Sequence, residues 1–321
     1  MYWKLVLLCC LALFGAATQA KSWPDRPITL VVSYPAGGGV DTAARIYSAA
    51  VSKILGQPIV VENRAGASGA IGAQAVVRAA PDGYTFLLSS PAEVLVTPIS
   101  GKPLPYDPEN DLTPIAFVGD TPLGIVAYPE NAPSSLAELV INSQNKGVNF
   151  NYGTPGTGST MHFAGAAMQA IAGVNWQHVP YKGAAPAIND VLGGQIAFAI
   201  TGLPPLVEHI KAGKLTLLAV TSAKRSPLFA DIPAISELPS MASYQFTNWL
   251  GIFGPDHLPL DIVEKLGSAF ETAAKDDIVQ QKLHKSGWHP RVLRQAEFMR
   301  FLTEERNRYQ TVRDKAGAID K

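Results

Sequence analysis

Three glycine-rich turns hold the residues of this sequence whose types and spacing are suited to chemistry. They cover residues 35–41, 66–69 and 153–158, and each is followed by a helical pattern. Turns of this kind direct backbone N–H groups and hydroxyls outward from the start of a helix, which suits a carboxylate. The competing interpretation is that the glycines only close tight turns, with Asp41 and Ser159 as helix caps.

Known phosphate-binding loops do not match these turns. The segment 153–160 has the spacing of a Walker A loop, yet Ser159 stands where the phosphate-binding lysine is required. Gly66, Gly69 and Gly72 form G-x-x-G-x-x-G rather than the dinucleotide fingerprint G-x-G-x-x-G. We therefore expect no nucleotide and no other cofactor.

Catalytic constellations are also weak. The six histidines form no H-E-x-x-H or comparable ligand pair, so we expect no metal site. Ser68 lacks the second glycine of the G-x-S-x-G nucleophile elbow. His162, one turn into the helix after Ser159, suits a structural bond as well as a ligand bond. A secreted hydrolase that pairs Ser68 or Ser159 with a histidine remains the alternative from another class.

The first twenty residues form a separate unit. Lys4 is followed by an apolar run over residues 5–17 and by small residues up to Ala20, the three-part pattern of a secretory signal peptide. The run is too short to span a bilayer, so we expect cleavage near Ala20, a mature start at Lys21 and a periplasmic protein. Both cysteines, Cys9 and Cys10, lie in this segment, which excludes disulfides and thiol chemistry from the mature chain.

Charge and hydropathy describe the rest as an ordinary packed protein. The 26 Lys and Arg balance 26 Asp and Glu, and loss of Lys4 leaves 26 − 1 = 25 basic against 26 acidic residues, a net charge of −1. A nucleic-acid-binding protein would usually be basic. Hydrophobic residues at 47% and a length of 321 residues suit two domains of usual size.

Strand and helix patterns alternate along the mature chain, which predicts mostly parallel sheets covered by helices on both faces. Strands are predicted at residues 28–34, 58–62, 84–89, 148–152, 176–179, 195–200 and 215–221. Helices are predicted from just after Asp41 to Leu55 and at residues 70–80, 159–172, 184–192, 205–212, 259–275 and 295–316. The proline-punctuated stretch 91–122 is predicted as a loop, and the last two helices are predicted to cover the first of two sheets.

A series of motifs runs through the whole mature chain. They include Pro35-Ala-Gly-Gly-Gly-Val-Asp41, Glu62-Asn63-Arg64-Ala-Gly66, Pro81-Asp-Gly-Tyr-Thr85, Leu104-Pro-Tyr-Asp-Pro108, Tyr152-Gly-Thr-Pro-Gly-Thr-Gly-Ser-Thr-Met-His162 and His178-Val-Pro-Tyr-Lys-Gly183. With these motifs the sequence resembles the Bug (TctC-like) family, the periplasmic solute-binding receptors of tripartite tricarboxylate transporters.

The resemblance implies an α/β, two-lobed periplasmic-binding-protein fold of the Venus flytrap, type II, kind, each lobe a mostly parallel sheet flanked by helices. Lobe 1 would comprise residues 21–122 and 246–321 and lobe 2 residues 123–245, with strands crossing near Pro122 and Tyr244. The implied function is capture of a small dicarboxylate, tricarboxylate or aromatic acid between the lobes, without catalysis. Implied partners are this carboxylate and the membrane permease subunits of the transporter, or alternatively a membrane sensor, and no nucleic acid.

The family holds its ligand mainly with loop backbone amides, hydroxyls and ordered water. Carried over by motif, the first-lobe contacts are Ala36, Gly37, Gly38, Gly39, Val40, Asp41, Ser68, Gly69, Ala70 and Ser90, and the second-lobe contacts are Ser159, Thr160, His162, Tyr181, Lys182 and Gly183. Tyr34 and Trp249 suit an aromatic slot or, as the simpler interpretation, core packing.

Three positions depart from the family pattern. Val40 replaces the usual Ser or Thr, which removes a hydroxyl from the first turn, and Ala166 replaces a frequent Glu. Thr201, a further expected contact, stands where many members carry Asp, whose charge would suit a cationic amino group. The exchange at Thr201 favours a carboxylate without an amine.

Overall fold

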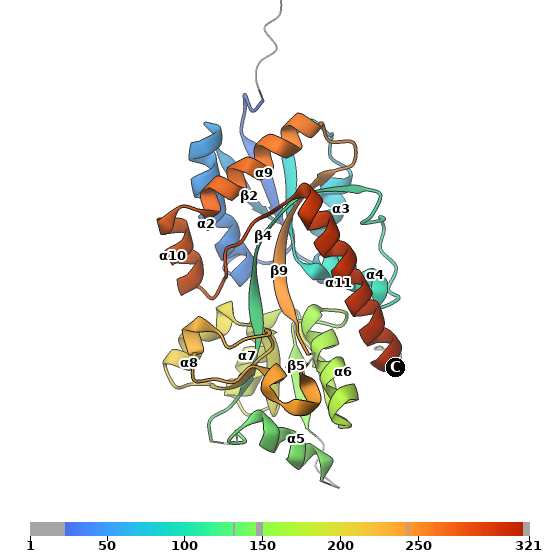
Figure 1. Cartoon of the computed structure of the whole chain (residues 1–321), viewed down its shortest axis with the longest axis vertical. Helices are drawn as coiled ribbons and strands as arrows, with labels where there is room; N and C mark the ends of the chain where they lie inside the picture. Colours follow the sequence, from blue (N-terminus) through green and yellow to red (C-terminus); the bar gives the residue numbers. More distant parts are fainter. Residues whose placement is uncertain (1–22, 131, 146–149, 243, 317–321) are drawn as a thin grey trace, which may run out of the picture.

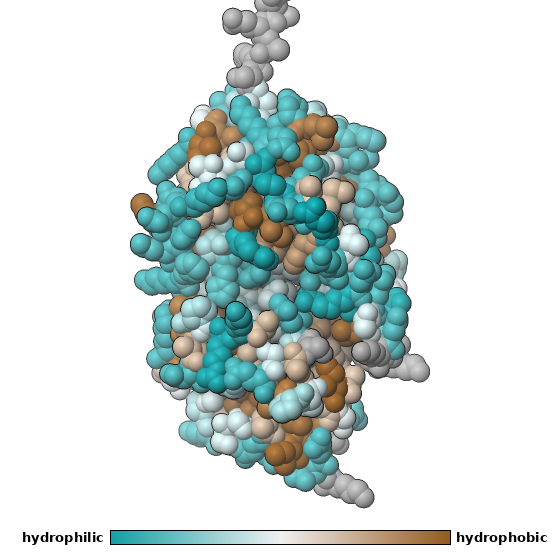
Figure 2. All heavy atoms as spheres, in the orientation of Figure 1, coloured by the Kyte–Doolittle hydropathy of each residue, from teal (hydrophilic) through white to brown (hydrophobic). Residues whose placement is uncertain are grey.

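The computed structural model describes residues 23–130, 132–145, 150–242 and 244–316 (Figure 1). The expected signal peptide, its cleavage site and the mature start at Lys21 lie outside these ranges. Within them, no helix combines the length and the apolar character that crossing a membrane would require. Hydrophilic residues cover most of the face seen in Figure 2, with separate apolar patches between them.

The first sheet is built on three parallel strands. β1 (Ile28–Val32) lies between β2 (Ile59–Asn63) and β3 (Thr85–Ser89), and β3 pairs antiparallel with β9 (Thr247–Pro255). The long strand β4 (Leu112–Ala127) follows β9, again antiparallel. Four of the five residues of β1 are buried, as expected of a continuous apolar run in a sheet with both faces covered.

The second sheet contains the other end of β4. This end pairs antiparallel with β7 (Phe198–Gly202) on one side and with β8 (Thr216–Val220) on the other. β5 (Asn151–Thr154) pairs parallel with β7 and with the edge strand β6 (Gln177–Pro180). Each sheet is therefore mixed, with parallel strands at the side away from β4.

β4 is shared by both sheets, and its change of partner is abrupt. Pro122 is its last residue in register with β9, opposite Thr247, and Leu123 is its first in register with β7, opposite Gly202. β9 runs beside β4 from one half of the molecule toward the other (Figure 1). The two sheets are thus joined through continuous strands.

Helices cover both sheets. On the first sheet, α2 (Gly39–Leu55) packs against α9 (Leu260–Ala274), with Tyr47 and Phe270 in ring contact at 5.6 Å. The other described helices include α3 (Ala70–Val77), α5 (Leu136–Gln144), α6 (Thr160–Ala172), α7 (Ala184–Leu192), η3 (Pro204–Leu206), α8 (Val207–Lys211), α10 (Asp277–Lys285) and α11 (Gln295–Ala316).

The C-terminal helix α11 contacts both halves of the molecule. Phe298 lies against Phe117 of β4 at a centroid distance of 6.2 Å, and the short strand β10 (Leu293–Arg294) that precedes α11 pairs with β4. Further along, Tyr309 meets Phe163 of α6 edge-on at 5.6 Å. The predicted cover for the first sheet is confirmed, and α11 additionally packs on the second (Figure 1).

The prediction of a loop at 91–122 is confirmed only for residues 100–111 and is wrong on either side of them. The chain forms a turn of π-helix, η2 (Ala92–Val96), continues as α4 (Thr97–Ile99) and enters β4 at Leu112. Residues 92–96 form this helical turn because all of them are buried against the rest of the protein. β4 tolerates Pro114 because its register with β9 shifts there, which is where a strand can hold a proline.

Several boundaries also differ from the predictions. α2 begins at Gly39, before Asp41, and Gly38 is its N-cap. β7 lies later than predicted because residues 193–195 form a turn closed by the N–H of Gln195 on the carbonyl of Asp190. The resemblance implied a strand crossing near Tyr244, and β9 begins at Thr247, whereas the helices α5 and α10 were not predicted.

Candidate functional site

Asp41 organises the first glycine-rich turn from inside. Its carboxylate accepts hydrogen bonds from Gly37 N at 2.9 Å, Arg45 Nε at 3.0 Å and Asn63 Nδ2 at 2.9 Å. Burial alone would raise the pKa of Asp41, but the bonds from Arg45, Gly37 and Asn63 lower it overall. Asp41 is therefore not the helix cap that one interpretation made it; its carboxylate holds the turn around Gly37 closed.

Two helices begin at the glycine-rich turns with backbone N–H groups directed away from the helix. In α2 the first such groups belong to Gly39 and Val40, and the cap at Gly38 supplies no side-chain acceptor. In α6 they belong to Thr160 and Met161, after the predicted cap Ser159, whose hydroxyl accepts from His162 N at 3.2 Å. Each of these helix starts has the backbone geometry that suits an anion.

A buried acid lies beneath the first turn. Glu93 of η2 is fully buried and accepts from the Tyr34 hydroxyl at 2.8 Å and from Ser90 N at 3.0 Å. The hydroxyls of Tyr34 and Ser90 lie 2.5 Å apart. Burial raises the pKa of Glu93, against the effect of these hydrogen bonds. Tyr34 and Ser90, both expected to contact ligand, thus share a buried network.

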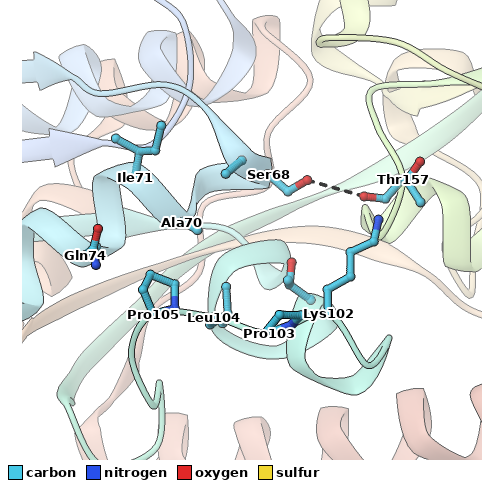
Figure 3. A pocket seen from close by; sticks show the side chains of 11 residues that line it. Ser68, Ala70, Ile71, Gln74, Lys102, Pro103, Leu104, Pro105 and Thr157 are labelled. Atoms are coloured by element: carbon cyan, nitrogen blue, oxygen red, sulfur yellow. Dashed lines mark hydrogen bonds between the residues drawn. The ribbon is translucent and has the colours of Figure 1, made fainter.

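The second turn, residues 66–69, lies against the buried network of Tyr34, Ser90 and Glu93. Ala67 and Ser68 have φ angles of 48° and 52°, a left-handed conformation that non-glycine residues rarely adopt. Gly69 must be glycine, because a Cβ there would lie 2.8 Å from Cδ of Glu93. The Ser68 hydroxyl donates to the Thr157 carbonyl at 3.4 Å, which joins this turn to the one after β5 (Figure 3).

His162 is a neutral side chain with a defined tautomer. Gly158 N donates to its Nδ1 at 3.2 Å, so the proton is carried by Nε2. Burial and the positive charge of Lys102 lower the pKa of His162 to about 4. The ring stacks on His178 at 3.8 Å, and Nε2 of His178 is bonded to Thr154 at 2.7 Å. His162 is therefore suited to donate one hydrogen bond at neutral pH.

The remaining predicted contacts lie in the 181–183 turn and at Thr201. In the 181–183 turn, the Tyr181 hydroxyl donates to Asp190 at 2.6 Å, Lys182 is exposed, and Gly183 begins α7 with φ 113°. Thr201 is fully buried within β7, and its hydroxyl donates to the Gly202 carbonyl at 3.1 Å.

Trp249 lies in the core. It is fully buried, and its ring nitrogen donates to Glu305 at 3.2 Å. The core interpretation of Trp249 is therefore confirmed, whereas Tyr34 is only half-buried.

The turns of the two sheets meet around Pro204. A Cβ atom on Gly39 would lie 2.9 Å from Cβ of Pro204, and one on Gly202 would lie 3.7 Å from Cε of Met161. The start of α2 is therefore brought next to the segment that also borders the start of α6. Proline at 204 carried no recognisable signal in the sequence.

A cavity opens beside the Ser68–Thr157 contact. It has a volume of about 310 Å³ and is of the size of small-ligand pockets. Figure 3 shows Lys102 reaching toward Thr157 across this space, with α3 opposite. Its lining is Ala67, Ser68, Ala70, Ile71, Gln74, Thr97, Lys102, Pro103, Leu104, Pro105 and Thr157.

Sequence reasoning missed Glu93 and Lys102, which the structure places beside the turns. A lone acid inside the apolar run 92–96 is the one signal that marked Glu93. Lys102 stood in the segment taken for a loop, and its Nζ lies 3.8 Å from the position of a Cβ on Gly158.

The hydroxyls proposed for a hydrolase are engaged elsewhere. Ser68 donates to a backbone carbonyl, and Ser159 accepts from a backbone N–H. Neither of these bonds joins a serine to a histidine ring. In the part of the chain that the structure describes, no group of three or more His, Cys, Asp and Glu residues is arranged to hold a metal ion.

Comparison with known proteins gives consistent matches. The family model described as "Tripartite tricarboxylate transporter family receptor" matches residues 43–318. Protein BugT from Bordetella pertussis is 33% identical over 305 residues, which cover 95% of this chain and 93% of that protein.

Two solved structures share the fold over almost the whole chain. R. palustris Rpa4515 with adipate superposes with a TM-score of 0.87 at 31% identity, covering 92% of this chain and 98% of that one. MatC from Rhodopseudomonas palustris with bound malate has a TM-score of 0.81 at 28% identity, covering 90% and 99%. The two joined α/β sheets are thus the architecture of periplasmic binding proteins of this type.

Proposed function

Because the chain belongs to the tripartite tricarboxylate transporter receptor family of periplasmic binding proteins, we propose that it captures a small carboxylate and delivers it to a membrane permease. The observation that carries the proposal is the meeting of two helix starts, α2 and α6, from different sheets. Each start presents backbone N–H groups suited to a carboxylate.

The ligand lies between two lobes in this proposal. Lobe 1 comprises residues 21–122 and 246–321, and lobe 2 comprises residues 123–245. The change of partner of β4 between Pro122 and Leu123 supports the first boundary. The bond from Phe246 N to the Thr221 carbonyl, just before β9, supports the second.

Backbone amides and a few hydroxyls supply the affinity. Each hydrogen bond to a charged group contributes about 1.5–3 kcal/mol, so three or four bonds support micromolar binding, about −8 kcal/mol, after association costs. The proposed contacts are the motif residues at 36–41, 68–70, 159, 160, 162 and 181–183. Tyr34, Ser90 and Thr201 act behind them, because their hydroxyls are bonded within the protein.

The ligand carries no amino group. Asp41 and Glu93, the acids beside the turns, are bonded to neighbouring protein groups, and Thr201 offers no charge to a cation. Rpa4515 was solved with adipate and MatC with malate, both dicarboxylates without an amine. These observations favour a dicarboxylate.

Thermal unfolding of residues 21–321 against mono-, di- and tricarboxylates, aromatic diacids and acidic amino acids tests the proposal. A ligand at 100 times its dissociation constant adds about 2.7 kcal/mol, which raises the midpoint by about 5–10 °C. A shift confined to amine-free acids, with the acid recovered unchanged, supports the receptor. A flat panel, with no small molecule released from the denatured protein, contradicts it.

Export and delivery are tested separately. N-terminal sequencing of the protein from a periplasmic fraction is expected to begin at Lys21. Crosslinking in membranes distinguishes a permease from a sensor as the partner. Capture of a sensor alone would contradict delivery and leave carboxylate binding intact.

A further inference from the structure

The cavity beside the Ser68–Thr157 contact continues from the proposed ligand site. Ser68 and Ala70, both proposed contacts, belong to its lining, and Thr157 supplies the side formed by the second sheet. Its volume of about 310 Å³ equals roughly ten water molecules at about 30 Å³ each. The space is therefore large enough for several carbon atoms and a carboxylate.

The walls of this cavity are largely apolar, with five polar side chains among the lining residues. Ile71 and Leu104 provide aliphatic surface, whereas Gln74, Thr97 and Lys102 provide an amide, a hydroxyl and an ammonium group. A largely apolar cavity lined also by one cation and by neutral hydrogen-bonding groups suits a hydrocarbon chain that ends in an anion.

Thr97 gives an independent indication of a polar ligand. The residue is 6% exposed, and its hydroxyl has no hydrogen-bond partner among the described residues. Buried hydroxyls are normally hydrogen-bonded, so one without a partner at a cavity wall calls for an acceptor that is brought from outside.

Lys102 carries its charge to the junction of the cavity with the proposed site. Its side chain reaches toward Thr157 (Figure 3), and its Nζ lies 3.8 Å from the position of a Cβ on Gly158. Its charge also reaches His162, whose pKa it helps to lower. A carboxylate at the junction would meet this ammonium group.

We propose that this cavity is a subsite for the distal half of an α,ω-dicarboxylate, with Lys102 as the counter-charge and Thr97 as a hydrogen-bond donor to the second carboxylate. The inference rests on the proposed function, since the first carboxylate lies at the two helix starts. Ile71 and Leu104 contact the methylene chain, so an elongated diacid binds better than a short one.

Calorimetric titration of α,ω-dicarboxylates of increasing length, each compared with the monocarboxylate of equal length, tests the inference. In Lys102→Met we expect a 10- to 150-fold loss of affinity for the preferred diacid, from the loss of one bond between charged groups, and little change for the monocarboxylate. Lys53→Met is the matched control, because Lys53 lies in the last turn of α2, about 21 Å along the helix axis from its start.

Thr97→Val distinguishes a loss of ligand binding at the subsite from a loss of protein stability. Since the hydroxyl has no partner among the residues that the structure describes, its removal is expected to leave the unliganded protein equally or more stable. The same variant is expected to weaken binding of the preferred diacid several-fold. Equal affinity of diacid and monocarboxylate, or unchanged diacid affinity in Lys102→Met, overturns this inference alone. Failure of every acid to bind the unchanged protein overturns the proposed function as well.

Discussion

Replacing Gly39 by alanine tests whether the two sheets must come together around the ligand. Gly39 stands at the start of α2, and a Cβ atom there would lie 2.9 Å from Cβ and 3.3 Å from Cγ of Pro204. Carbon atoms prefer separations of about 3.5–4.0 Å. The segment after β7 must therefore move away by roughly 0.6–1 Å.

This displacement destabilises the closed arrangement of the two lobes. Overpacking by one methyl group costs about 1–3 kcal/mol, which corresponds to a loss of affinity of about 5- to 150-fold. Unliganded lobes can separate to relieve the contact, so the unfolding midpoint without ligand is expected to change little. Calorimetric titration with the best acid from the thermal panel measures the affinity, and small-angle scattering measures the ligand-dependent compaction.

Gly202→Ala is the matched control. A Cβ there meets Met161 and Pro204 at 3.7 Å, an ordinary contact, so affinity is expected to remain within about threefold of the parent. If Gly39→Ala binds the acid as tightly as the unchanged protein and compacts to the same extent, the contact plays no part in the bound state. The placement of the ligand between the lobes would then have to be given up.

Three further substitutions test the network around the turns. Asp41→Asn is expected to lower the free energy of unfolding by about 1–3 kcal/mol at pH 7. Because the pKa of Asp41 is lower in the folded than in the unfolded state, this stabilisation is present above about pH 4 and disappears as the pH falls further. The thermal midpoints of parent and variant should therefore converge in acid. Burial and Lys102 lower the pKa of His162 to about 4, so as the pH falls from about 6.5 the unfolded state takes up a proton before the folded state does. The free energy of unfolding, measured in urea, should therefore fall less between pH 7 and pH 5 in His162→Gln than in the parent. An equal fall in both proteins would contradict the assignment of a low pKa to His162. Glu93→Leu removes the carboxylate that accepts from the Tyr34 hydroxyl and from Ser90 N, and should lower the free energy of unfolding by about 1–3 kcal/mol for each bond. Glu93→Gln should lower it less. Similar losses in the two variants would show that packing alone stabilises this region.

The parallel strands could be predicted because their chemistry is local. Residues 28–32 form an apolar, β-branched run that is buried in β1, and the glycines after it mark the turn. The long strand β4 could not be predicted in the same way. It contains Pro114, Gly119 and Pro122, which read as loop residues, and only its pairing with β9 and the shifts in that register make them acceptable.

The candidate site was predictable as a set of turns but not as a network. Glycine spacing locates the turns before α2 and α6, because the positive φ angles of Gly37, Gly156 and Gly158 favour glycine. Glu93 leaves only the trace of a lone acid in an apolar run, because its bond from Tyr34 comes from an element distant along the chain. Asp41 was correctly associated with its turn, but its role depends on Asn63, which only the folded sheet brings near.

The last helix of the chain determines when folding can be completed. α11 supplies Phe298 to the core around β4 and Tyr309 to the core beside α6, so both cores stay open until residues 295–316 have been synthesised. An incomplete chain lacks the ring contacts of Phe298 with Phe117 and of Tyr309 with Phe163. For the exported chain proposed above, the packing of α11 on both halves is therefore completed only when nearly the whole polypeptide is available.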